Sequence, residues 1–135
     1  MNWRTEKLLL QVAVGLGSLV PILAGGAGIW WGPEFLRGSP APVPADLDSH
    51  FRYLSGLLLG IGLSFLSCIP GIEGKGARFR LLGAIVLVGG LGRALSLLDV
   101  GLPGQGHRLA LGMELVTMPL LMLWQWRIAR RGRPT

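Results

Sequence analysis

The chain of 135 residues is long enough for one domain, and 50% of its residues are hydrophobic while only 15% are charged. A water-soluble domain of this size has too little interior for so much apolar surface, and the mean hydropathy of +0.53 favours a lipid bilayer as the solvent. A net charge of +6 would suit a nucleic-acid partner, but no nucleic-acid motif is present and no compact basic face remains outside the apolar runs. We therefore expect a single integral membrane domain over residues 1–135 and no nucleic-acid partner.

Four apolar runs occupy most of the chain, and each is long enough to cross a hydrocarbon core of about 30 Å at about 1.5 Å per residue. They cover about residues 8–31, 50–69, 79–98 and 107–126. The last two connections are short, whereas residues 32–48 form a Pro-rich loop that excludes a regular helix. The predicted fold is all-α: an antiparallel bundle of four transmembrane helices.

The positions of Lys and Arg predict the orientation. Nine of the 13 lie in the N-terminal segment, the turn at residues 71–80 and the C-terminus, which share one side of such a bundle. Because cytoplasmic ends carry an excess of Lys and Arg, we expect both termini in the cytoplasm (N-in/C-in) and the Pro-rich loop outside. Tryptophans at the ends of spans are typical of membrane interfaces. A basic C-terminal tail can bind anionic lipids or an acidic partner. These interface residues are Trp30, Trp31, Trp124, Trp126, Arg127, Arg130, Arg131 and Arg133.

An intramembrane polar cluster is expected in the outer half of the bilayer. Arg93 lies within the third span and Glu114 is the only carboxylate in the fourth, each about 10 Å below the outer interface. Ser96, Asp99 and Arg52 fall near the same depth. An ionisable side chain costs at least about 2.5–3.5 kcal/mol in the membrane. The cluster is therefore either a structural lock built on an Arg93–Glu114 pair or a polar pocket for a ligand, and the sequence leaves both open.

Glycines predict where helices approach closely. Gly56 and Gly60 form a small-xxx-small motif in the second span, and Gly89 and Gly92 lie in the third. Small residues at such spacings let two helix backbones come together in lipid. We expect these four glycines to pack helices.

Motifs for catalysis and cofactors are missing. The sequence has no phosphate-binding Walker loop, no HExxH, no nucleophile elbow and no Cys/His spacing for a metal, which favours a non-catalytic protein and predicts no metal site. His50 and His107 lie at predicted helix ends, where contact with water is favoured over ligation of haem or a pigment. A bound membrane lipid is the expected ligand, and no cofactor is predicted.

Two segments and one carboxylate carry a family resemblance. FRYLSGLLLGIGL at residues 51–63, GRALSLLDVGLP at 92–103 and the following Glu114 resemble the domain of unknown function 4345 family. The resemblance implies a small four-helix protein of the bacterial inner membrane, and it implies no activity. The matching positions are Arg52, Gly56, Gly60, Gly92, Arg93, Ser96, Asp99 and Glu114.

Three functional hypotheses follow. The first is an accessory or structural subunit that packs its glycine-lined faces and basic tail against a larger membrane complex, or against copies of itself. The second is a lipid- or quinone-like ligand binder, or an enzyme, that uses the outer-leaflet polar cluster. A transporter is a third reading, although one short bundle leaves little room for alternating access.

Overall fold

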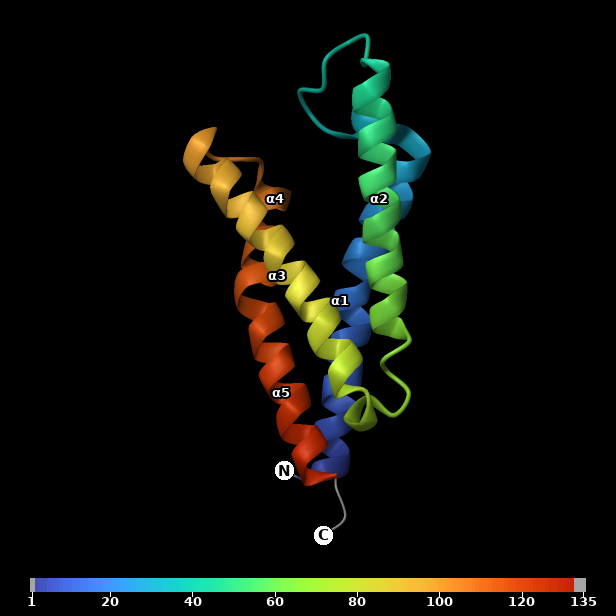
Figure 1. Cartoon of the computed structure of the whole chain (residues 1–135), viewed down its shortest axis with the longest axis vertical. Coiled ribbons are helices and arrows are strands. Elements are labelled where there is room, and N and C mark those ends of the chain that lie inside the picture. Colours follow the sequence, from blue (N-terminus) through green and yellow to red (C-terminus); the bar gives the residue numbers. More distant parts are fainter. Residues whose placement is uncertain (1, 133–135) are drawn as a thin grey trace. The chain divides into compact units, whose positions relative to one another are not determined.

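The computed structural model describes residues 2–132, apart from the side chain of Phe35, and all regular structure in that range is helical. The predicted all-α class is confirmed. The helices are α1 Trp3–Trp31, α2 Ala45–Leu66, α3 Gly76–Asp99, α4 Gln105–Gly112 and α5 Met118–Arg131 (Figure 1). A π-helical turn, η3 Met113–Thr117, joins α4 to α5, and short 3-10 turns lie at η1 Gly32–Phe35 and η2 Ile72–Gly74.

Three of the helices are long and apolar enough to cross a membrane. They are Trp3–Glu34, Gly76–Asp99 and the continuous helix Gln105–Arg131. Among the described residues, α2 does not meet the same threshold, because its first turns are polar. It begins at Ala45, directly after Pro44, and is therefore longer at its start than the predicted 50–69. These lengths and compositions are compatible with a small helical membrane protein.

The chain forms two compact units. Unit 1 comprises Met1–Gln11 and Pro70–Thr135, and unit 2 comprises Val12–Ile69. The helix α1 therefore contributes its first turns to unit 1 and its remainder to unit 2.

In unit 2, α1 and α2 run antiparallel and side by side (Figure 1). Glycines make this approach possible. A Cβ atom at Gly25 would lie 2.6 Å from the backbone nitrogen of Leu59, and one at Gly62 would lie 2.7 Å from Ile22 Cγ1. Gly28 faces the side chain of Ser55 in the same way. The two backbones are therefore as close as small residues allow.

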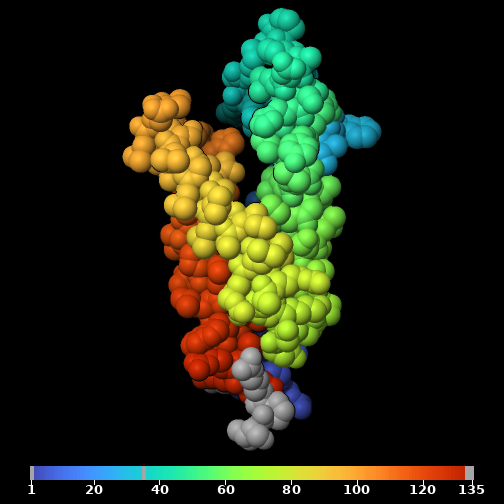
Figure 2. Space-filling model, in the orientation of Figure 1, coloured from blue at the N-terminus to red at the C-terminus, as the bar shows by residue number. Residues whose placement is uncertain are grey.

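In unit 1, α3 packs along α5 and the π turn, as the adjoining yellow and red surfaces in Figure 2 show. Phe79 and Ile128 are completely buried. Two glycines of α3 again set the separation: a Cβ at Gly83 would lie 2.5 Å from Met122 Sδ, and one at Gly90 would lie 2.7 Å from Leu115 Cδ2.

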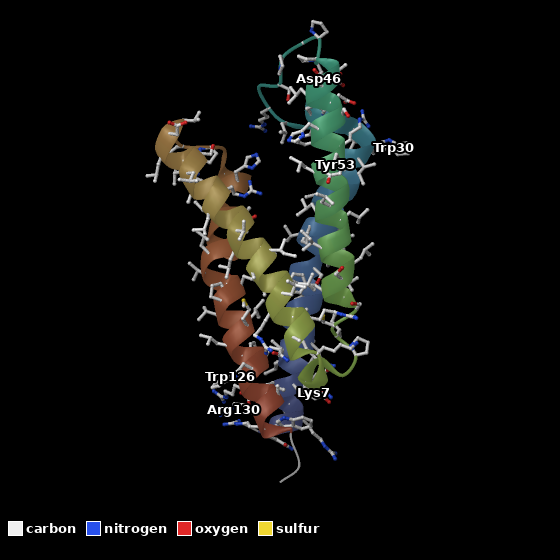
Figure 3. The ribbon with its side chains drawn as sticks, in the orientation of Figure 1. Lys7, Trp30, Asp46, Tyr53, Trp126 and Arg130 are labelled. Carbon is white, nitrogen blue, oxygen red and sulfur yellow. The ribbon has the colours of Figure 1, made fainter. Side chains whose placement is uncertain are left out.

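The start of α1, the turn η2 and the end of α5 meet at one end of unit 1. Trp3 Nε1 donates a hydrogen bond of 3.3 Å to the carbonyl of Ile128. Gln125 Nε2 donates one of 2.8 Å to the carbonyl of Ile72. Three segments far apart in the sequence are thus joined at this end, where Figure 3 labels Lys7, Trp126 and Arg130.

Candidate functional site

Arg93 of α3 and Glu114 of the π turn form an ion pair. Arg93 Nε donates to both carboxylate oxygens, at 3.1 Å to Oε1 and 2.9 Å to Oε2. The Arg93 side chain is 35% exposed and the Glu114 side chain 19%. The two residues that we expected to share a depth are therefore in direct contact.

A third residue, His107 of α4, completes the cluster. Arg93 Nη1 lies 3.0 Å from His107 Nδ1. A guanidinium has only donors, so Nδ1 must be the acceptor and the imidazole must be neutral, with its proton on Nε2. Sequence reasoning assigned His107 to contact with water and missed this interaction. The signal was the short 99–106 connection, which brings the start of the fourth span beside the end of the third.

The π turn shapes the surroundings of Glu114. The backbone N–H of Met118 bonds to the carbonyl of Met113, five residues back. Pro119, one residue later, has no backbone N–H and cannot bond to the carbonyl four residues before it. The regular α-helical hydrogen bonds are therefore already interrupted here. Turns of this kind within α-helices occur frequently at functional sites.

Gly90 fixes how closely Glu114 approaches α3. A Cβ atom at Gly90 would lie 2.9 Å from Glu114 Cβ, which is closer than side chains tolerate. The absence of a side chain at this position therefore brings the carboxylate within reach of Arg93, one turn further along α3.

The cluster retains unused hydrogen-bond donors. Arg93 has five N–H groups, of which Nε binds Glu114 and one on Nη1 binds His107. No acceptor among residues 2–132 contacts the two N–H groups of Nη2, and His107 Nε2–H is also without one. The arrangement therefore suits a molecule that presents acceptor oxygens.

Ser96 and Asp99 lie further along α3 and do not join this cluster. Both are exposed, and neither side chain forms a hydrogen bond or ion pair within the described part of the chain. Together with Leu95 and Leu98 they line a shallow open hollow. Asp99 is thus available to solvent or to another molecule and is not paired with Arg93.

Arg52 belongs to unit 2 and has partners of its own there. Its Nε donates to Asp48 Oδ2 at 2.8 Å, and its Nη1 donates to the carbonyls of Ile29 and Trp30, the latter at 3.1 Å. These carbonyls belong to the last turn of α1, which lacks intrahelical donors. Gly32, with φ of +66°, places the chain against this Asp48–Arg52 pair. In unit 2, Arg52 caps the C-terminus of α1.

The four predicted packing glycines face open space. Apart from the chain neighbours and the nearby backbone of the same helix, no described atom lies within 4 Å of a Cβ placed at Gly56, Gly60, Gly89 or Gly92. The close approaches within the two units are made at other glycines, namely Gly25, Gly28, Gly62, Gly83 and Gly90. Packing of the predicted four against another molecule stays a prediction.

The predicted interface residues fall into two groups. Trp30 and Trp31 at the end of α1 are exposed, and Trp30 points away from the ribbon in Figure 3. At the end of α5, Trp124 is partly buried, and the Arg130 guanidinium lies over the Trp126 ring, 4.5 Å from its centre. Arg133 lies outside the described residues.

Two arginines of this tail bind a carboxylate that the sequence analysis did not consider. Arg127 Nη2 lies 2.7 Å from Glu6 Oε1, and Arg131 Nη1 lies 2.7 Å from Glu6 Oε2. Glu6 is only 2% exposed. The signal was present: Glu6 lies just before the first predicted span, in the N-terminal segment that was predicted on the same side as the basic tail.

Lys7 and Glu73 form a second ion pair at this end, with 2.7 Å between Nζ and Oε1. The hydrogen bond from Lys7 lowers the pKa of the Glu73 carboxyl, although partial burial acts in the opposite direction. His50, at the start of α2, is exposed, and no group of three metal-ligating side chains occurs between residues 2 and 132.

Comparison with known proteins gives one match. The sequence matches the family described as "Domain of unknown function (DUF4345)" over residues 9–125, which includes the Arg93 cluster, all of unit 2 and part of unit 1. No curated protein and no solved structure matches the chain.

Proposed function

Because the chain belongs to the DUF4345 family, a domain of unknown function, we propose a function from the geometry of the site itself. We propose a small protein that spans the bacterial inner membrane four times and binds a lipid- or quinone-like ligand at the Arg93–Glu114–His107 cluster. The proposed role is binding, because what the cluster offers is a set of hydrogen-bond donors.

The meeting of the chain ends supports four spans. Trp3 contacts Ile128 and Glu6 contacts Arg131, so the first turn of α1 and the last turn of α5 lie at one end of unit 1. A chain whose ends share one side of a membrane crosses it an even number of times. Three helices already qualify as spans, and α2, with 22 residues and a length of about 33 Å, is long enough to be the fourth.

The charges at this end support a cytoplasmic location for both termini. The turn η2 lies there too, since Ile72 and Glu73 contact Gln125 and Lys7. The segments that carry the surplus of Lys and Arg thus lie together at one end of unit 1. The positive-inside rule associates such an end with the cytoplasm.

The observation that carries the binding proposal is the set of unused donors on Arg93 and His107. An arginine in an apolar helix is costly unless its donors are satisfied. A ligand with a carbonyl or acidic oxygen would occupy these donors, and its apolar part would lie along exposed leucines of α3 such as Leu91 and Leu95.

The test is purification from native membranes in mild detergent, followed by mass spectrometry of the bound small molecules. We expect a defined acceptor-bearing molecule with the wild-type chain. It should be lost in the double variant Arg93→Leu/Glu114→Leu and retained in Arg108→Gln, which removes a neighbouring exposed charge. If the wild-type chain carries no such molecule and the double variant is fully stable, the Arg93–Glu114 pair has only a structural role and the binding proposal is rejected.

A second candidate function, an accessory subunit, is favoured by the open glycines of α2 and α3. A Cβ atom placed at Gly56 or Gly60 has no atom of the described chain outside its own helix within 4 Å, so we expect the fold of the isolated protein to tolerate Gly56→Leu and Gly60→Leu. If these positions contact a larger membrane complex or a second copy, the same substitutions should abolish co-purification. Unchanged co-purification would reject this face as an interface.

A further inference from the structure

One end of unit 1 is strongly basic, which differs from the expectation that no compact basic face remains outside the apolar runs. The segments that meet there carry eight cationic and two acidic side chains among the described residues, and we call this surface the basic end. The acids are Glu6 and Glu73. The cationic residues are Arg4, Lys7, Lys75, Arg78, Arg80, Arg127, Arg130 and Arg131.

Glu6 positions two of these cations. Its buried carboxylate binds Arg127 and Arg131, which lie one helical turn apart on α5 and therefore on the same face. The two arginine side chains remain 55% and 49% exposed. The contact thus holds both guanidiniums at one carboxylate while about half of each arginine side chain stays exposed.

A hollow lies directly beside this pair. It is lined by Glu6, Leu123, Trp124 and Arg127. Leu123 is exposed, and so is Leu120, about one helical turn closer to the middle of α5. A ligand there would meet cations at one side and an apolar wall at the other.

From this geometry we infer that the hollow binds the headgroup of an anionic phospholipid. The lipid phosphate accepts hydrogen bonds from Arg127 and Arg131, and the start of the acyl chains lies against Leu123 and Trp124. One carboxylate shared by two guanidiniums leaves one net positive charge, which complements one phosphate, and the surrounding cations add to the attraction. The apolar wall favours a lipid over free phosphate, which would gain nothing from it.

The experiment is native mass spectrometry of the full chain in mild detergent, with equal amounts of phosphatidylglycerol and phosphatidylcholine of matched acyl chains. We expect preferential retention of phosphatidylglycerol. The variants Arg127→Gln and Arg131→Gln should each lower that retention about fivefold, whereas Arg37→Gln, which removes the same charge from unit 2, should leave it unchanged. Single variants are used because the remaining arginine still neutralises the buried Glu6.

The triple variant Glu6→Gln/Arg127→Gln/Arg131→Gln is the control for misfolding, because it removes both arginines without leaving a buried charge unpaired. It should keep its thermal transition and lose the lipid preference. Equal retention of both lipids by the wild-type chain would overturn the inference. An equal loss of phosphatidylglycerol retention in Arg127→Gln and Arg37→Gln would also overturn it, because the lipid preference would then depend on net charge alone. Displacement of the lipid by excess inorganic phosphate at constant ionic strength would mean that the hollow recognises the anion without its lipid.

Discussion

The substitution Gly90→Ala tests whether the separation of α3 and the π turn depends on one missing side chain. The new Cβ would lie 2.7 Å from Leu115 Cδ2 and 2.9 Å from Glu114 Cβ. The leucine methyl can rotate away, but the Glu114 Cβ is fixed to the backbone of the turn. The helices must therefore separate by several tenths of an ångström, which moves the carboxylate relative to Arg93.

The expected cost follows from two opposing effects. Overpacking a close helix contact costs about 1–3 kcal/mol, whereas replacing glycine by alanine within a helix gains up to about 1 kcal/mol. The matched control is Gly89→Ala, where no described atom lies within 4 Å of the new Cβ. Only the helix-propensity gain applies there. We expect Gly90→Ala to be less stable than Gly89→Ala by about 1–3 kcal/mol.

The assay is reversible unfolding of the purified chain in mixed micelles, with both variants measured beside the wild type. Gly89→Ala should be as stable as the wild type or slightly more stable. If Gly89→Ala destabilises the isolated chain as much as Gly90→Ala, the assignment of Gly90 as the contact glycine is wrong.

Three further changes have defined outcomes. Arg93→Leu and Glu114→Leu should each destabilise the chain by about 2–3 kcal/mol, because each leaves a charge unpaired, and the double variant should recover much of this loss in micellar unfolding. Because Lys7 lowers the folded-state pKa of Glu73 below its ordinary value of 4.5, the pair should stabilise the chain at neutral pH and lose its effect as the pH falls through that lowered pKa. An acid titration of unfolding should show this dependence in the wild type and not in Lys7→Gln. Finally, Arg52→Gln should weaken the end of α1, seen as faster hydrogen exchange at its last amides and unchanged exchange in α3.

The sequence could predict the fold class because apolar length is a local property. Runs such as 79–98 are too long and too apolar for anything but a helix across a membrane or in a core, and the structure has α3 at Gly76–Asp99. The family resemblance, drawn from residues 51–63, 92–103 and Glu114, is likewise confirmed by a match over residues 9–125. Depth in the membrane could also be predicted from the sequence, because it depends only on counting residues from the end of each span. This counting placed Arg93 and Glu114 at the same depth.

Rotation about the helix axis was not accessible. Consecutive residues are about 100° apart, so Gly89 and Gly90 face different directions although both are glycines in one apolar run. Gly89 was the predicted packing glycine, whereas the structure has Gly90 against Glu114. The π turn at Met113–Thr117 adds a further rotation that no regular helical wheel includes. Pro119 was the only local sign of it.

Glu6 changes how the basic tail has to be tested. Deleting residues 127–135 is a direct way to ask whether the tail docks on a partner. It would also remove both guanidiniums from a carboxylate that is 2% exposed, and a buried carboxylate left without a partner costs about 3–5 kcal/mol. Loss of co-purification after such a deletion would therefore follow from unfolding of the basic end as readily as from a lost contact. Arg130→Gln avoids this ambiguity, because Arg130 lies over Trp126 and does not bind Glu6. A docking role for the tail requires that this single change weakens the association while the thermal transition stays unchanged.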